Sequence, residues 1–548
     1  MDFEWLNKKS KIFLSGGYLE EGEDPIHRVR DIAATAEIIL GIKGFADRFL
    51  DHAAKGHFLF SSPVWANFGR KRGLPISCFG SYVPDTMEGI LDTNSEIGMM
   101  SKMGGGTSAY YGAVRSRGSK ISTGGKSDGS VSFMRINNVT VDVSKQSKVR
   151  RGICACYLPI DHGDIEEFLQ IKHEGHPIQH LFTGVTVSNQ WMREMIEGDV
   201  EKRKIWAKVI KSRFEIGLPY IFFSDNVNDN KPQVYKDLQK EIYASNVCSE
   251  IMLPSNTQES FVCCLSSMNL LHYHDWKDTD AVEIMMQFLD AIMSEFIAKA
   301  SLVPHMERAV RFAAEHRAVG MGATGWHSLL QSKGIPFGSL EALQLNKEIF
   351  SLMDEQSLEA SRKMAETHGT TRMMAPYNER WATRMSLAPN TSSAFILGQV
   401  SQSKEPIWKN YYTKELAKID TPIKNPELVK LFAERNIDEK VWRQILLADG
   451  SIQNLNVFDD HEKEVFKTFP EIAPKDIIMQ AAGRQPYIDQ GQSTNLMIHP
   501  DTPAKEMNEL LIYAWENGIK SLYYQHNASN AAQTFYRKNL NECSVCEG

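Results

Sequence analysis

The segment SNVCSEIMLP, residues 245–254, carries three side chains that could act on one small ligand: Asn246, Cys248 and Glu250. In an extended chain, residues two apart point to the same side, so we predict that this amide, thiol and carboxylate share one face. The apolar residues that follow would exclude water. Such a set suits a thiol that reacts with a substrate while a neighbouring carboxylate moves a proton. The alternative is a buried structural cysteine beside a solvated glutamate, and the spacing alone leaves both open.

The chain has 8 cysteines among 548 residues, which is too sparse for a disulfide scaffold and indicates a reduced, cytoplasmic protein. Near the C-terminus, Cys543 and Cys546 form a CxxC pair, which by itself is half a zinc site, a redox dithiol or neither. Zinc would need two more ligands, and no second CxxC or neighbouring histidine pair is present, so no metal is expected there. A dithiol on a mobile tail that exchanges with another disulfide fits better. Cys154 and Cys156, two apart on a predicted strand, are expected to pack in the core.

Two phenols, Tyr523 and Tyr524, stand side by side shortly before the tail. Adjacent tyrosines are what stepwise proton-coupled electron transfer would require. Taken in isolation, the pair indicates aromatic packing.

Composition places the chain among ordinary globular proteins, with 42% hydrophobic and 24% charged residues. The net charge of 61 − 68 = −7 provides no basic field for nucleic acid. No apolar run approaches the roughly 18 residues of a membrane helix, and no apolar segment follows the charged N-terminus as a secretory signal requires. We therefore expect no binding to nucleic acid or membrane.

Helix and strand patterns alternate over most of the chain and favour an α/β architecture, either a barrel or a large open sheet. Asp24 and Pro25 read as the cap and first position of a helix that runs to about residue 41, and a second helix follows to residue 56. Residues 104–129 are glycine-rich and predict a loop region, which either holds phosphate on its backbone amides or simply connects elements. The other expected elements are a strand at 153–159, a helix that starts at 164 and extends to 172, a helix at 281–300, and one long or two short helices at 340–368.

The ordered set of motifs resembles the large, catalytic subunit of ribonucleotide reductase. Asn-x-Cys-x-Glu before an apolar stretch is similar to the active-site finger loop of that family. The other matching stretches occur in the same linear order: PISC at 75–78, DTMEGI at 85–90, MGGG at 103–106, VRSRG at 114–118, QSKVRRG at 146–152, CCLSSMNL at 263–270, RAVGMGATG at 317–325, APNTSS at 388–393 and LYYQ at 522–525.

The resemblance implies a ten-stranded α/β barrel over residues 76–525 with the finger loop threaded through its centre. It also implies an N-terminal helical region at 1–75 and a flexible redox tail at 526–548. Only 23 residues precede the Asp24 cap, so we expect no N-terminal ATP cone, the module that carries the activity site in many class I subunits.

The implied activity is radical reduction of ribonucleotides, with ribonucleoside diphosphates as the expected substrates, to 2′-deoxyribonucleotides. In this chemistry Cys248 would be a transient thiyl radical, Glu250 an acid/base on the 3′ hydroxyl, and Asn246 a hydrogen-bonding partner of the sugar. Cys78 and Cys263 would supply two electrons and close to a disulfide. The residues expected to bind substrate are Ser62, Ser77, Gly106, Thr391, Ser392 and Ser393.

A tyrosine pair together with a cysteine tail is the class I arrangement, in which a separate small (beta) subunit holds the radical on a metallocofactor. The chain itself would then bind no cofactor apart from nucleotide effectors (dNTP or ATP), at a specificity site that includes Asp85, Arg115, Gln146 and Arg150. The other expected partners are thioredoxin or glutaredoxin as reductant and a second copy of the chain in a homodimer.

Two alternatives stay open at this point. The adenosylcobalamin-dependent class shares the barrel and the finger loop and would need neither the tyrosine pair nor a small subunit. A nucleotide-binding regulatory relative that has lost turnover is the non-enzymatic reading. A requirement of turnover for cobalamin or for a second protein distinguishes the two enzyme classes.

Overall fold

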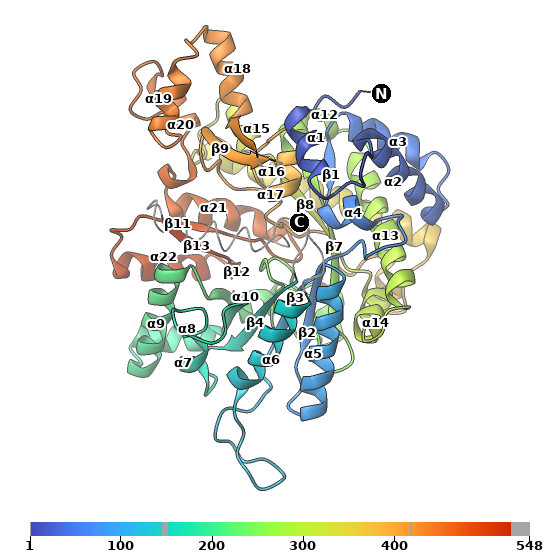
Figure 1. Ribbon diagram of the computed structural model, residues 1–548, viewed down its shortest axis with the longest axis vertical. Coiled ribbons are helices and arrows are strands. Elements are labelled where there is room, and N and C mark those ends of the chain that lie inside the picture. The colour runs from blue at the N-terminus through green and yellow to red at the C-terminus, as the bar shows by residue number, and fades with distance from the viewer. Residues whose placement is uncertain (1, 145–151, 417–418, 528–548) are drawn as a thin grey trace.

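Five parallel strands form one wall of a barrel in the computed structural model, which describes residues 2–144, 152–416 and 419–527 (Figure 1). They pair in chain order, because a helical connection follows each strand and returns the chain to the same edge of the sheet. They are buried along nearly their whole length, as a parallel sheet covered on both faces requires. The strands are β2 (Cys78–Tyr82), β3 (Gly106–Tyr110), β4 (Ile153–Pro159), β5 (Leu181–Val187) and β6 (Tyr220–Phe223).

The opposite wall begins at β7 (Phe261–Asn269), which pairs antiparallel with β2 and parallel with β8 (Val319–Thr324). β1 (Phe58–Phe60) pairs antiparallel with β7, so the N-terminal region is joined to this wall. At the far edge of the first wall, β12 (Ser521–Leu522) pairs antiparallel with β6. A short parallel pair, β11 (Leu496–Ile498) with β13 (Gln525–Asn527), lies beside it.

Isolated bridges and backbone hydrogen bonds close the two walls into a ring. β8 forms a bridge with segment 385–387, which forms a second bridge with segment 491–495. Directly after β12, the Tyr523 amide donates to the Thr494 carbonyl at 2.9 Å. With these two segments counted beside β2 to β8 and β12, ten strands surround the barrel interior in the described part of the chain, which confirms the predicted ten-stranded α/β barrel.

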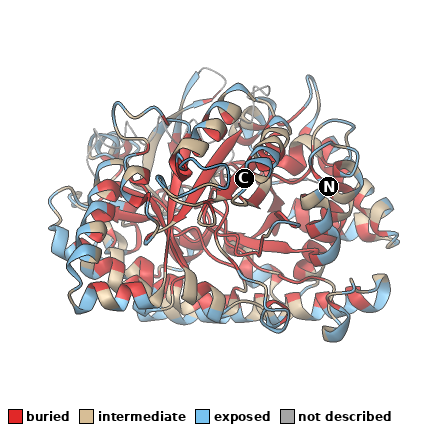
Figure 2. Cartoon of the chain, turned by 90° about the horizontal axis from the view of Figure 1, so that it is seen from below, coloured by how far each residue is buried: buried red, intermediate tan, exposed pale blue. Residues whose placement is uncertain are grey.

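Helices cover the outside of the barrel, and in Figure 2 the strands are mostly buried while exposed residues gather on the outer helices. α13 (Ala281–Ala300) is buried on most of its surface, because α2 (Pro25–Leu40), α16 (Leu340–His368), β7 and β8 all pack against it. The other helices of the barrel region are α5 (Met87–Lys102), α6 (Ser130–Val143), α7 (Ile165–Phe168), α8 (Asn189–Glu197), α9 (Val200–Ile216), α10 (Ser224–Asp229), α11 (Gln233–Asp237), α12 (Tyr273–Trp276), α14 (Glu307–His316), α15 (Trp326–Ser332), α17 (Thr391–Ile396), α21 (Pro474–Arg484) and α22 (Ala504–Glu516). Short 3₁₀ turns occupy Leu270–His272, Ala375–Tyr377, Phe469–Glu471 and Gln485–Tyr487.

The N-terminal region is helical, as predicted, and contains α1 (Lys8–Ser15), α2, α3 (Phe45–Ala54) and α4 (Ser62–Asn67). The Asp24 side chain accepts from the His27 amide at 3.0 Å and starts α2, and Gly41 ends it with φ of 65°. Both caps were readable from residue type, because proline suits the first helical position and glycine adopts positive φ without strain.

Residues 409–467 form a small satellite of the barrel, in the upper left of Figure 1. It consists of the hairpin β9 (Tyr411–Leu416) and β10 (Ile419–Lys424) and of α18 (Pro426–Arg435), α19 (Val441–Leu447) and α20 (Asp460–Val465). Eight buried side chains make its own apolar cluster: Leu428, Phe432, Trp442, Ile445, Ile452, Phe458, Val465 and Phe466. The sequence pattern did not separate this unit from the barrel.

Three of the expected elements, β4, α13 and α16, have the predicted bounds, and α16 is a single helix. α7 ends at Phe168, so the helix expected to reach residue 172 is wrong in length. The glycine-rich stretch is also only partly a loop, since β3 begins inside it at Gly106. Gly105 allows this close packing, because a Cβ there would lie 2.6 Å from the Phe79 ring.

Candidate active site

Residues 246–253 cross the inside of the barrel and are held by both walls. On the side of β4, the Tyr157 hydroxyl donates to the Asn246 carbonyl at 2.9 Å. On the opposite side, the Gly491 amide donates to the Glu250 carbonyl, also at 2.9 Å. The segment therefore occupies the central position that was predicted for the finger loop.

Asn246 and Glu250 meet at the tip of this loop through a turn. The Ser249 amide donates to the Asn246 carbonyl at 3.2 Å, and Ser249 has a φ of 59°. The Asn246 side-chain amide then donates to Glu250 Oε1 at 2.9 Å, while its carbonyl oxygen accepts from the Glu250 backbone amide at 3.1 Å. The extended geometry predicted for residues 246, 248 and 250 is thus wrong, because the loop must reverse inside the barrel, yet the amide and the carboxylate do come together.

The Glu250 carboxyl is completely buried, with 0% of its surface exposed. Burial raises its pKa to about 7, although hydrogen bonds from Asn246 and Ser493 and the charge of Lys404 act in the opposite direction. The Ser493 hydroxyl lies 3.0 Å from Glu250 Oε2. A carboxyl group with a pKa near neutrality can both take and return a proton under ordinary conditions.

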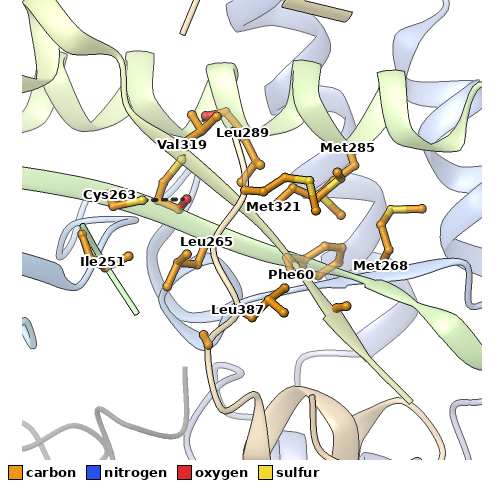
Figure 3. Close-up of a cluster of buried hydrophobic side chains, with 14 of the residues drawn as sticks. Phe60, Ile251, Cys263, Leu265, Met268, Met285, Leu289, Val319, Met321 and Leu387 are labelled. Atoms are coloured by element: carbon orange, nitrogen blue, oxygen red, sulfur yellow. Dashed lines mark hydrogen bonds between the residues drawn. The ribbon is translucent and has the colours of Figure 1, made fainter. Parts of the chain in front are cut away.

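Cys78 and Cys263 are directly opposite each other in the antiparallel pair of β2 and β7. Both are free thiols, as are the other four cysteines in the described residues. Burial raises the pKa of Cys263 well above its usual value, and the Gln490 side-chain amide lies 3.4 Å from its sulfur. Figure 3 shows Cys263 in one buried apolar cluster with Ile251 of the finger loop and Val319 of β8.

Tyr523 and Tyr524 lie at the edge of the same interior, with ring centroids 4.3 Å apart. A third buried phenol, Tyr220 of β6, lies 4.9 Å from the first ring and 5.2 Å from the second. Burial raises the pKa of Tyr523 well above its usual value, and Cys248 is the neighbour that contributes most to this shift. The tyrosine pair is therefore adjacent to the finger-loop thiol, which aromatic packing alone did not require.

The residues expected to bind substrate come from α4, from the paired starts of β2 and β3, and from α17. Ser62 starts α4, and Gly106, whose amide donates to the Ser77 carbonyl at 2.7 Å, pairs with Cys78. Thr391, Ser392 and Ser393 form the first turn of α17, which contacts the end of β1 shortly before Ser62. The Ser392 hydroxyl lies 3.2 Å from the Tyr18 hydroxyl, and the Ser393 hydroxyl lies 3.5 Å from the Phe60 carbonyl.

The predicted effector residues are only partly described. Arg115 Nε donates to Asp85 Oδ2 at 2.7 Å, so these two side chains form an ion pair at the carboxyl ends of β2 and β3. Gln146 and Arg150 lie outside the described residues, as do Cys543 and Cys546 of the tail dithiol. Their roles stay predictions.

Three polar residues of this interior were not foreseen: Lys404, Gln490 and Ser493. All three are buried. Gln490 contacts Cys263 and Ser493 contacts Glu250, whereas Lys404 donates to Ser493 and acts on Glu250 through its charge. They come from segments without a recognised motif, and no local pattern distinguishes them from ordinary loop residues. Within the described ranges, no group of three or more His, Cys, Asp or Glu side chains is arranged to hold a metal ion. The same part of the chain has no helix long and apolar enough to cross a membrane.

Comparison with known proteins identifies the family of the chain. The barrel domain of ribonucleotide reductase matches residues 76–200, 194–380 and 374–525. The chain belongs to the ribonucleotide reductase family. It is 34% identical over 530 residues to the putative ribonucleoside-diphosphate reductase large subunit of Frog virus 3, with 92% of each chain covered.

Further ribonucleotide reductase large subunits are similar over most of the chain. The large subunit of Caenorhabditis elegans is 29% identical over 582 residues, covering 90% of this chain and 71% of its own. The solved structure of the Actinobacillus ureae class Id alpha subunit superposes with a TM-score of 0.92 at 50% identity, covering 97% of this chain and 99% of that one. The predicted large-subunit, class I alpha assignment is confirmed, and with it an oxidoreductase of deoxyribonucleotide synthesis.

Proposed function

We propose that this chain reduces ribonucleoside diphosphates to 2′-deoxyribonucleotides through a thiyl radical on Cys248. The observation that carries the proposal is the convergence of Asn246, Cys248 and Glu250 inside the barrel, next to the paired thiols Cys78 and Cys263. The relatives are named as ribonucleoside-diphosphate reductases, which favours the diphosphate as substrate.

The reaction starts when the Cys248 radical takes the hydrogen atom from C3′ of the ribose. Ionised Glu250 accepts the proton of the 3′ hydroxyl. The Asn246 side-chain amide donates to Glu250 Oε1 at 2.9 Å and holds the carboxylate in place for this step. Both side chains are buried, which excludes bulk water from this proton transfer.

The Cys78 and Cys263 thiols then supply two electrons and two hydrogens. One hydrogen leaves with the 2′ hydroxyl as water, the other ends on C2′, and the two sulfur atoms form a disulfide. Cys248 finally returns its hydrogen to C3′ and regains the radical, while Glu250 gives the proton back to the 3′ oxygen. Directly opposite residues of an antiparallel pair have Cα atoms about 4.5–5.5 Å apart, which is within the range of a disulfide.

The radical would reach Cys248 through Tyr524 and Tyr523 from a separate small subunit. That subunit would supply the one-electron oxidant, a radical kept by its own metallocofactor. The 4.3 Å separation of the two rings and the proximity of Tyr523 to Cys248 support this route.

Two further roles complete the proposal. The Cys543–Cys546 dithiol would reduce the Cys78–Cys263 disulfide by thiol–disulfide exchange, with thioredoxin or glutaredoxin as its own reductant. A dNTP or ATP effector would bind near Asp85, Arg115, Gln146 and Arg150 and select the substrate base, in a homodimer of the chain.

The test is reconstitution of the full chain with its candidate small subunit and a dithiol reductant, followed by measurement of deoxyribonucleotide from each ribonucleoside diphosphate. Product that depends on the small subunit is expected. Product that depends on added adenosylcobalamin, with no need for a second protein, would reject the radical route proposed here. No product under either condition, with nucleotide binding intact, would favour the non-catalytic reading.

A further inference from the structure

A buried lysine, Lys404, lies next to the proposed catalytic carboxyl. It belongs to the segment between α17 and β9, and only 4% of its surface is exposed. Its ammonium group donates to the carbonyl of Ser493. The hydroxyl of the same serine lies 3.0 Å from Glu250 Oε2 and 2.5 Å from the Cys248 carbonyl. One residue, Ser493, thus connects the ammonium group to the finger loop.

We propose that Lys404 is a positioning residue that keeps Glu250 ionised, as the hydrogen-bonded connection from its ammonium group through Ser493 to the Glu250 carboxylate indicates. This inference rests on the proposed function, in which the ionised form of Glu250 takes the 3′ proton. Lys404 does not touch the reacting atoms. It acts through the charge that it holds inside the barrel.

The net charge of Lys404 and its charged neighbours is zero when all of them are ionised. Glu405 is buried beside it and accepts from the Asn495 backbone and side-chain amides at 3.2 and 2.8 Å. The buried guanidinium of Arg484, whose charge also acts on Lys404, donates to Asn346 Oδ1 at 2.8 Å. Two carboxylates, Glu250 and Glu405, therefore face two cations. Loss of the Lys404 charge would leave one negative charge in excess in a medium of low dielectric, where protonation of a carboxylate is the least costly response.

The groups that face Glu250 from the other walls do not replace this charge. The Tyr157 phenol of β4 and the Cys263 thiol of β7 are neutral, because burial raises the pKa of both well above their usual values. Cys248 is the remaining titratable neighbour on the finger loop. The positive charge of Lys404 acts against the effect of burial on the Glu250 pKa. Burial lowers the pKa of Lys404 itself to about 8, so Lys404 is charged at neutral pH.

The Ser493 hydroxyl has a single hydrogen, so the acceptor to which it donates depends on the protonation state of Glu250. The hydroxyl can donate either to the Cys248 carbonyl or to Glu250, and the contact to the carbonyl is the shorter. With Glu250 protonated, the carboxyl can donate to Ser493 while the serine donates to the loop. With Glu250 ionised, the serine must share its hydrogen, and the positive charge of Lys404 on the Ser493 carbonyl favours this state.

The direct test is infrared titration of the Glu250 carboxyl in the full-length Lys404→Met protein, read as the difference from the same protein with Glu250→Gln. An opposite charge that acts on a buried carboxyl shifts its protonation equilibrium about tenfold or more, so loss of the Lys404 charge should move the titration midpoint toward alkaline pH. The matched control is Lys520→Met, since Lys520 is also buried and donates to backbone carbonyls of Asp489 and Gln490 but does not act on Glu250. An unchanged midpoint in Lys404→Met would overturn the inference.

A second variant shifts the balance the other way. Glu405→Gln removes a negative charge and leaves Lys404 in excess, so the Glu250 midpoint should move toward acid pH. General loosening of the fold would hydrate Glu250 and also move its midpoint toward acid pH, so Glu405→Gln is compared with Lys520→Met, in which no shift is expected. If Lys404→Met fails to fold, an acid shift in Glu405→Gln that Lys520→Met lacks decides the question. An alkaline shift or no shift in Glu405→Gln would count against the inference.

Turnover provides the functional readout. If the ionised fraction of Glu250 at pH 7 falls from about one half to about one tenth, kcat of Lys404→Met should fall about fivefold at pH 7 and recover near pH 9. Loss of turnover that does not recover at alkaline pH would show a merely structural role. If instead Glu250→Gln retains full turnover, the proposed function fails, while the infrared midpoint still reports on Lys404.

Discussion

Cys78 and Cys263 are direct cross-strand neighbours, one on each side of the junction between the two walls of the barrel. The register of β2 is fixed on both of its edges. Phe79 pairs with Val262 of β7, and Cys78 also pairs with Gly106 of β3. A shift of the register by one residue would turn one thiol away from the interior. The two thiols are thus held ready to form a bond that the structure does not yet contain.

Formation of a disulfide between Cys78 and Cys263 is the first expected outcome. After a single turnover without external reductant, peptide mapping should find these two cysteines joined in an amount close to that of the product. Cys154 and Cys156, two apart on the same strand, should stay reduced and provide the internal control. Product made with both Cys78 and Cys263 still free would contradict their role as electron donors.

Replacement of Cys248 by serine should abolish turnover and leave nucleotide binding intact. The reason is that an alcohol O–H bond is stronger than a thiol S–H bond, so serine cannot carry the radical, while its size preserves the loop. Cys264→Ser is the matched control, because this buried thiol donates to the Leu289 carbonyl and points away from the proposed chemistry. Multiple turnovers by the Cys248→Ser protein would remove the thiyl assignment.

The Glu250 carboxyl should make both activity and stability depend on pH. Its pKa of about 7 in the folded protein lies above the ordinary value of 4.5. The stability that it contributes is therefore fully present below the unfolded value and is lost as the pH rises through about 7. The melting temperature of Glu250→Gln, relative to the unaltered protein, should rise between pH 5 and pH 8. Any turnover that remains in Glu250→Gln should no longer fall toward acid pH near pH 7. A constant difference in melting temperature over this range would show that Glu250 titrates normally.

Tyr523→Phe and Tyr524→Phe should each stop radical transfer and preserve the fold and the association with the small subunit. Phenylalanine keeps the ring packing but has no O–H bond to give up its hydrogen. Tyr273→Phe is a suitable control, because this buried phenol donates to Glu348 outside the barrel interior. Stopped-flow measurement of radical loss in the small subunit distinguishes the outcomes, and full activity in both variants would point to another source of the radical.

Effector control should depend on Asp85. The ion pair with Arg115 must open if Asp85 is to accept from an effector sugar while Arg115 meets the phosphates. Asp85→Asn should weaken dNTP binding about tenfold or more and abolish the change in which base is reduced. The exposed carboxylate of Asp92 on α5 offers the control variant Asp92→Asn. Titration of each dNTP against all four substrates measures this, and an unaltered specificity pattern in Asp85→Asn would place the effector elsewhere.

The sequence by itself was sufficient for the local features of this protein. Asp24, Pro25 and Gly41 predicted the bounds of α2 because capping and backbone preferences act over a few residues. The order of the motifs predicted the barrel and the identity of the finger-loop residues. Even there, local reasoning failed at Ser249, where the loop turns because both walls hold it inside the barrel.

The tertiary structure alone decided which distant residues meet. Cys78 and Cys263 are 185 residues apart in the sequence and become neighbours through the register of β2 and β7. Glu250, Lys404 and Ser493 come from three separate segments, and their contact depends on closure of the ring by segments 385–387 and 491–495. Strand register and ring closure follow from packing of the whole core, which no window of local sequence contains. The electrostatic environment of the catalytic carboxyl is accordingly a property of the folded barrel.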